Sequence, residues 1–225
     1  MTRAIIETVP ALLRIQEMLG KIDQLRLPPG SRRDVECILV RQAAREVDRA
    51  LPTHAGHGHR TALVAQALGC LYRLEEEALH HLKLAAYLHD IGLLALPQSR
   101  DEFDTQLYRE SYRMIQNHAR LGGSLLEPFA FLRSASIIVA HHHERWDGGG
   151  YPYGIRGPFI PIEARILSVA DAFDAIEIPA NDSQDVRDYV AYRIIRVAAG
   201  TQFDPSIVKL LGQVLERRGS ILHGE

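Results

Sequence analysis

The stretch that is richest in residues able to do chemistry covers residues 137–151 and reads IIVAHHHERWDGGGY. An apolar run ends in three consecutive histidines, and a charged segment and a glycine turn that carries Tyr151 follow. Neutral imidazole is the commonest protein ligand of metal ions. Histidines at a helix terminus can also interact favourably with the last carbonyl groups of the helix. Taken alone, the stretch favours neither a metal site nor a polar helix end.

Histidines and carboxylates elsewhere in the chain favour a metal site. His57 begins one predicted helix, His89 and Asp90 end the next, His118 lies late in a third, and Asp171 lies inside the apolar run ILSVADAFDA of a later one. An aspartate in such a run is costly to bury unless it is paired or coordinates a cation. Several helices that each donate an imidazole or a carboxylate inward can build a metal centre. The donors include no thiolate, which suits iron or manganese better than a structural zinc.

The number of donors predicts two ions. The candidate ligands are His57, His89, Asp90, His118, His142, His143 and Asp171. About four to six ligands saturate a single ion. Asp90 is the candidate bridge because a carboxylate can offer one oxygen to each ion. Two cations acidify a bridging water, and the hydroxide can attack a phosphorus. We therefore expect phosphoester hydrolysis with His89 and Asp90 as catalytic residues, and the chain shows no serine or cysteine nucleophile motif.

Apolar residues with helical periodicity predict an all-α chain of about seven to nine helices. Residues 4–20 are predicted to be helical with an interruption at Pro10, and residues 25–31 (LRLPPGS) to be a linker. Further helices are predicted near residues 32–51, 57–72, 75–92, 105–123, 131–143, 161–177, 183–199 and 204–218. We expect the two N-terminal helices to contribute packing or a homodimer contact.

Composition is typical of a soluble globular domain, with 46% hydrophobic and 24% charged residues. A net charge of −2 gives no electrostatic attraction to nucleic acid or to an acidic membrane. Cys37 and Cys70 lie in apolar runs without a CxxC partner, so we expect buried thiols in a reducing compartment. The sequence has no stretch long enough to span a bilayer and no signal-peptide pattern. We expect a cytoplasmic protein.

Two strings, HDIG at residues 89–92 and HHERWDGGGYP at residues 142–152, resemble the signatures of the HD-GYP family, a branch of the HD-domain phosphohydrolases. The similarity extends to GHGHR, NHARLGGSLLE, IPIEARILSVADAFDA and AGTQFDPSIV, which lie within residues 35–215. The resemblance implies an HD-domain helical bundle that covers residues 32–219, after an N-terminal helical extension and linker (1–31) and before a tail (220–225). It also implies the same seven metal ligands, two or three iron or manganese ions, and hydrolysis of cyclic di-GMP to pGpG and sometimes to GMP.

The glycine turn is expected to form the mouth of the substrate site. The expected substrate contacts are Arg145, Gly150, Tyr151 and Pro152, and Arg156 is a further cation near the turn. Glu144 and Asp147 are expected to orient the histidine ligands. His54, His59, His80, His81 and His223 are expected to be surface or helix-terminal histidines.

The chain also departs from the family pattern. Members with a third metal carry a glutamate four residues before the first histidine, where this chain has Thr53; we therefore expect two ions, with His54 a candidate substitute ligand. Leu93 replaces a lysine that reaches the substrate phosphate, and Ala180 and Ser183 replace substrate-holding arginines. Each charge-assisted phosphate contact contributes about 1.5–3 kcal/mol, so their loss weakens binding.

These observations leave two classes of function open. The complete ligand set favours a phosphodiesterase that hydrolyses cyclic di-GMP with a dinuclear metal-hydroxide mechanism. The missing cations favour a catalytically weak or inactive module whose glycine loop contacts a diguanylate cyclase or another signalling protein. A phosphohydrolase with another nucleotide substrate is a further alternative.

Overall fold

The computed structural model describes residues 3–96, 114–177 and 182–218. Within these ranges the chain forms helices and no strand, which confirms the predicted all-α fold. The nine α-helices of the described ranges are α1 (Arg3–Gln24), α2 (Pro29–Ala50), α3 (His57–Tyr72), α4 (Glu76–Leu88), α6 (His118–Leu126), α7 (Arg133–His141), α8 (Ile162–Ala175), α9 (Gln184–Val197) and α10 (Pro205–Arg218). Four short 3-10 helices join them: η1 (Pro52–His54), η2 (His89–Ala95), η3 (Ala130–Leu132) and η4 (Gly157–Phe159). None of the described helices combines the length and the apolar character that crossing a bilayer requires.

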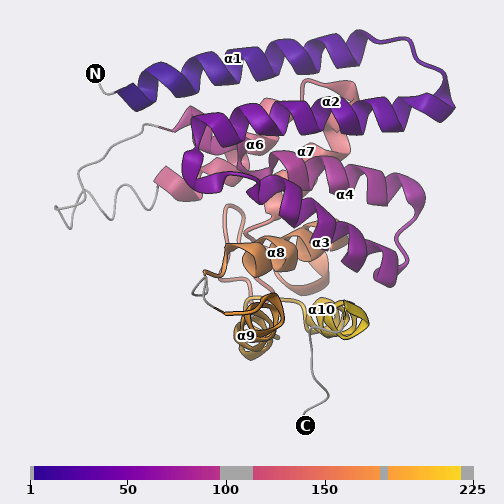
Figure 1. Cartoon of the computed structure of the whole chain (residues 1–225), viewed down its shortest axis with the longest axis vertical. Helices are drawn as coiled ribbons and strands as arrows, with labels where there is room; N and C mark the ends of the chain where they lie inside the picture. The colour runs from indigo at the N-terminus through magenta and orange to yellow at the C-terminus, as the bar shows by residue number, and fades with distance from the viewer. Residues whose placement is uncertain (1–2, 97–113, 178–181, 219–225) are drawn as a thin grey trace.

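The helices are stacked from one end of the molecule to the other (Figure 1). α1 and α2 lie side by side and antiparallel at one end, and α9 and α10 lie at the opposite end. α3 packs against both α4 and α8 in the middle. Leu68 of α3, Leu84 of α4 and Ile166 of α8 are fully buried there. This apolar packing fixes the ends of three helices relative to one another, and four of the candidate ligands lie at or near those ends: His57, His89, Asp90 and Asp171.

The first helix belongs to the same apolar core as the rest of the chain. Ala11, Ile15 and Leu19 of α1 recur every four residues and are buried in the core cluster. α2 begins at Pro29, so the connection between α1 and α2 is shorter than the predicted linker. Proline is favoured at the first position of a helix because its missing N–H has no helical partner there. The division into an extension, a domain and a tail stays a prediction.

The segment around His118 differs from its prediction. Most of the helix predicted to start at Thr105 lies outside the described residues, which resume at Met114. A turn at Asn117 separates residues 114–116 from α6, so His118 begins a helix and does not lie late in one. No proline or glycine marks this break, and the apolar pattern continues across it. The sequence therefore gave no signal for the break.

Two predictions about isolated side chains are wrong. His80 is buried, and its ring contacts residues of α2. Its Nε2 lies 2.9 Å from Glu36 Oε2 and its Nδ1 lies 3.7 Å from Cys37 Sγ. Neither of the two thiols is fully buried: Cys37 is half-buried and Cys70 is exposed on α3. Helical periodicity predicted most of the described helices but not which flank of each helix meets its neighbour.

Candidate metal centre

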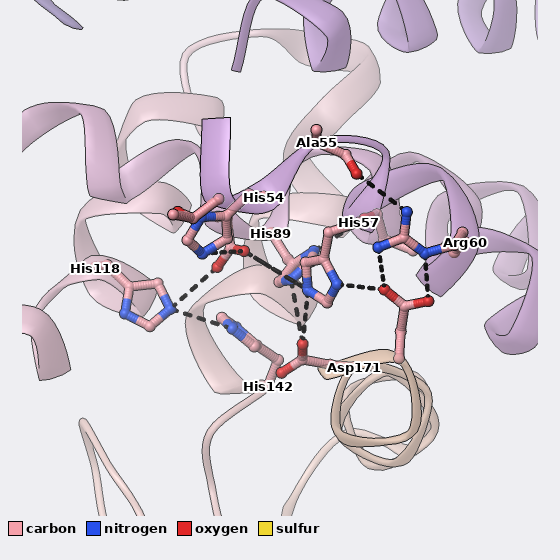
Figure 2. Close-up of polar contacts among 12 residues, drawn as sticks. His54, Ala55, His57, Arg60, His89, His118, His142 and Asp171 are labelled. Atoms are coloured by element: carbon pink, nitrogen blue, oxygen red, sulfur yellow. Dashed lines mark hydrogen bonds and ion pairs between the residues drawn. The ribbon is translucent and has the colours of Figure 1, made fainter. Parts of the chain in front are cut away.

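Three side chains from three elements form a first group of possible ligands. His57 begins α3, His89 begins η2 and Asp171 lies in α8. His57 Nε2 lies 3.2 Å from His89 Nε2 and 3.0 Å from Asp171 Oδ1, and His89 Nε2 lies 3.5 Å from the same oxygen (Figure 2). Neighbouring donors on an octahedral ion with bonds of about 2.1 Å lie roughly 3 Å apart. The first group therefore has the spacing of donors that share one cation.

A second group consists of three histidines. His118 begins α6, and His142 and His143 follow the last residue of α7. His118 Nε2 lies 3.4 Å from His142 Nε2 and 3.1 Å from His143 Nε2. These atoms also lie close enough together to hold one ion.

Asp90 lies between the two groups. Its Oδ2 is 3.2 Å from His89 Nε2 and 3.8 Å from His57 Nε2, both in the first group. Its Oδ1 is 3.6 Å from His118 Nε2 in the second group. Because the two oxygens of one carboxylate face different groups, Asp90 has the geometry of a bridging ligand. The structure thus brings together all seven predicted ligands.

Backbone carbonyl groups fix the orientation of three of these histidines. Each acceptor lies three positions before its histidine: Ala86 for His89 (2.9 Å), Ile115 for His118 (2.7 Å) and Val139 for His142 (2.6 Å). A carbonyl oxygen can only accept, so Nδ1 of each ring carries the hydrogen and donates it. The lone pair on Nε2 is then directed at the cluster, as metal coordination requires.

His57 is oriented by a carboxylate that the sequence did not single out. Its Nδ1 donates to Asp174 Oδ2 at 2.7 Å. Arg60 Nε and Nη2 donate to the two oxygens of Asp174 at 2.7 and 2.9 Å. Asp174 follows Asp171 by three positions, which places both carboxylates on one face of α8. This spacing, in an otherwise apolar run, is the signal that could have identified Asp174.

The two groups differ in protonation when no ion is bound. Burial lowers the pKa of His118 and His142, and it lowers that of His143 to about 4, so these rings are neutral at pH 7. Burial also acts to lower the pKa of His57, but hydrogen bonds to Asp171 and Asp174 outweigh it and raise this pKa to about 9. His89 is buried too, but the carboxylates of Asp90 and Asp171 raise its pKa well above the ordinary value. The first group therefore holds protons, on His57 and His89, that a cation has to displace.

The glycine turn forms one wall of a cavity beside the second group. The cavity has a volume of about 420 Å³ and is lined by Gln116, His143, Glu144, Arg145, Gly149, Tyr151, Ser168 and Gln202. The Tyr151 ring lies 4.9 Å from the His143 ring, and the peptide bond between Tyr151 and Pro152 is cis. A Cβ atom on Gly150 would overlap the backbone of Arg145, so this glycine serves close packing. Substrate contacts by Gly150 and Pro152, neither of which lines the cavity, stay predictions.

The carboxylates of Glu144 and Asp147 accept hydrogen bonds from within the same loop. Glu144 is buried, and its Oε1 accepts a 2.7 Å hydrogen bond from Tyr153 N. Asp147 accepts from Arg145 Nη2 at 2.7 Å and from Gly149 N at 2.9 Å. These bonds shape the loop, and the roles predicted for both carboxylates at the histidine ligands stay predictions.

The positions that depart from the HD-GYP pattern carry other contacts. Leu93 on η2 is half-buried and packs against the core. Ser183 caps α9, where its hydroxyl accepts from Val186 N. Ala180 lies outside the described residues. Thr53 Oγ1 lies 3.0 Å from His54 Nδ1.

Known proteins resemble this chain over most of its length. The family model described as HD domain matches residues 41–207. The chain is 33% identical over 175 residues to a 3'3'-cGAMP-specific phosphodiesterase of Vibrio cholerae, covering 77% of this chain and 34% of that relative. It is 37% identical over 157 residues to a cyclic di-GMP phosphodiesterase response regulator of Xanthomonas campestris pv. campestris, covering 68% of this chain and 40% of that relative. The chain thus spans less than half the length of these relatives.

Solved structures support the same fold. A cyclic GMP-AMP specific phosphodiesterase of V. cholerae superposes with a TM-score of 0.58 at 20% identity, over 73% of this chain and 44% of that one. An HDGYP protein from Bdellovibrio bacteriovorus also has a TM-score of 0.58, at 17% identity, over 92% of this chain and 70% of that one.

Proposed function

Because this chain belongs to the HD-domain family, in its HD-GYP branch, we propose that it is a metal-dependent phosphodiesterase that hydrolyses cyclic di-GMP. The observation that carries the proposal is the position of Asp90, whose two oxygens face two separate groups of ligands. The two relatives described above are named for cyclic di-GMP and 3'3'-cGAMP, cyclic dinucleotides that both contain guanine. We take cyclic di-GMP as the substrate and pGpG as the first product.

The donor set fits two divalent ions such as iron or manganese. It combines imidazole nitrogens with carboxylate oxygens and contains no thiolate. His57, His89, Asp171 and one oxygen of Asp90 would hold one ion. His118, His142, His143 and the other oxygen of Asp90 would hold the second. When bound, a pair of such ions acidifies a water molecule and stabilises charge on phosphoryl oxygens.

The side chains of this chain position the ions and the substrate. The hydrogen bonds that the Nδ1 atoms of four histidines donate keep each Nε2 directed inward, so that little reorganisation is needed when an ion binds. Tyr151 lines the same cavity as His143. Its aromatic face could stack on a nucleobase of the substrate. Arg145 lines the same wall and supplies a cation there, although Asp147 partly neutralises it.

A second candidate function is a binding module that keeps its ions but turns over little substrate. Leu93 favours this alternative, because it packs against the core where HD-GYP proteins carry a phosphate-binding lysine. Ser183, which caps a helix, likewise supplies no cation. In such a module the loop that carries Tyr151 would contact a diguanylate cyclase or another signalling protein.

A turnover assay on metal-loaded protein tests the proposal. The protein is purified anaerobically, its iron and manganese are counted, and the products of cyclic di-GMP, 3'3'-cGAMP and cyclic di-AMP are separated by chromatography. We expect two ions and release of pGpG from cyclic di-GMP. Asp90→Ala should abolish turnover, whereas Asp185→Asn, a change at an exposed carboxylate on α9, should not. Two bound ions without turnover of any of the three substrates would refute the enzyme and support the binding module.

A further inference from the structure

His54 lies at the edge of the ligand cluster without belonging to either group. It is carried by η1, three positions before His57. Its Nε2 is 3.8 Å from Asp90 Oδ2, the same separation that His57 Nε2 has from that oxygen. The imidazole rings of His54 and His57 meet edge to face, with 6.0 Å between their centroids. Figure 2 shows His54 on the inner side of its turn, facing the cluster.

The Nδ1 atom of His54 has a hydrogen-bonding neighbour, as it has in the candidate ligands His57, His89 and His118. Its Nδ1 lies 3.0 Å from Thr53 Oγ1. A hydroxyl group can accept from Nδ1–H, and Nε2 then keeps its lone pair. His54 thus shares with His57, His89 and His118 an anchored Nδ1 and an Nε2 that points at the carboxylates.

The turn that carries His54 is tied to the first group. Gly56 adopts a left-handed conformation (φ 73°) that lets the chain reverse from η1 into α3. Arg60 Nη1 donates to Ala55 O at 3.0 Å, and the same guanidinium holds Asp174, the partner of His57. A single side chain therefore fixes the position of the turn relative to His57.

We propose that His54 is an additional ligand of the ion held by His57, His89, Asp171 and Asp90. The inference rests on the proposed dinuclear centre. It gives the first group five protein donors, against four for the second. The His54 side chain is 35% exposed, whereas those of His57 and Asp90 are 11% and 15% exposed. His54 therefore closes the solvent side of the first ion, and its loss should make that ion easier to exchange.

Metal titration of variants tests this role. Co²⁺ binding is followed by visible absorption and calorimetry for the wild type, for His54→Ala, and for His59→Ala as a matched control. His59 also lies near the start of α3 but stacks on Tyr87. We expect His54→Ala to weaken one of the two Co²⁺ sites by at least about tenfold. Replacing even a residue that only hydrogen-bonds to a ligand lowers metal affinity by about 10–100-fold. The other site and the His59→Ala protein should match the wild type.

Two further measurements make the result decisive. Added imidazole should restore the wild-type Co²⁺ spectrum of His54→Ala, since the exposed side leaves room for it, and should not alter His59→Ala. Should His54→Ala fail to fold, Thr53→Val removes only the hydroxyl that holds Nδ1 and should weaken the same site. Wild-type Co²⁺ affinities and an unchanged spectrum in both His54→Ala and Thr53→Val would overturn the inference while leaving the proposed function intact. A wild type that binds fewer than two ions would overturn the proposed function itself.

Discussion

Asp174 accepts a 2.7 Å hydrogen bond from Nδ1 of His57, which lies 117 positions earlier in the chain. The bond joins α3 to α8 and directs His57 Nε2 toward Asp171, 3.0 Å away. Arg60 holds the same carboxylate through both of its oxygens. Asp174 is therefore a positioning residue for the first group of ligands, which it contacts through Nδ1 of His57.

Asp174→Ala should weaken metal binding at the first group by about 10–100-fold, because His57 loses the partner that fixes its ring and its tautomer. The second group should be unaffected. Titration with Co²⁺, compared with Asp185→Asn on the exposed face of α9, measures the effect. Equal weakening of both sites would show instead that the substitution disturbs the fold.

The metal affinities of the two groups of ligands should respond differently to pH. His57 has a pKa raised to about 9 when no ion is present, so an ion that binds the first group at pH 7 displaces a proton. The pKa of His89 in the same group is also raised well above its ordinary value, so a second proton is displaced with the first. The affinity of this group should therefore rise by at least about tenfold per pH unit between pH 6 and 8. His143, with a pKa lowered to about 4, is already neutral over this range, and burial lowers the pKa values of His118 and His142 in the same direction. The second group should change little.

Co²⁺ titrations at pH 6, 7 and 8 measure this difference. One of the two affinities should follow pH and the other should not. The same slope for both would contradict the protonation states described above.

Leu93→Lys should restore a phosphate contact at the position after the HDIG string. Leu93 is half-buried on η2, so the lysine stem can keep the apolar contacts while its amine extends toward solvent. One charge-assisted hydrogen bond of about 1.5 kcal/mol lowers KM for cyclic di-GMP by roughly tenfold. Ala95→Lys adds the same charge at an exposed position of the same element and serves as the control. An equal change in KM for both variants would indicate a general charge effect and not a specific contact.

The buried pair of Glu36 and His80 should contribute to stability and not to metal binding. His80 Nε2 lies 2.9 Å from Glu36 Oε2, and Arg32 Nε donates to the other oxygen at 2.7 Å. His80→Ala leaves a buried carboxylate short of one partner, which costs about 1–3 kcal/mol of unfolding free energy. Urea denaturation measures the loss, with His81→Ala at the half-buried neighbouring position as the control. A change in the number of bound ions would contradict the separation of this pair from the metal centre.

The sequence predicted the residues of the candidate centre better than the contacts that orient them. His89, Asp90 and His142 were recognisable because polar residues follow an apolar helical run at the point where the helix ends. The spacing of Asp171 and Asp174 indicates a polar face of α8, but it does not identify the partner of Asp174, because His57 lies 117 positions away. Glu36 and His80 were missed for the same reason, since 44 positions separate them. Local periodicity defines the helices, whereas pairs between helices depend on how the helices pack.

Electron paramagnetic resonance of the Mn²⁺-loaded protein tests most directly whether Asp90 joins two ions. We predict two Mn²⁺ per chain with a magnetically coupled spectrum, because one carboxylate and a shared water would link them. Asp90→Ala should remove the coupling, and Asp185→Asn should preserve it. A single ion per chain, or two ions that each give an uncoupled six-line signal in the wild type, would contradict a dinuclear centre.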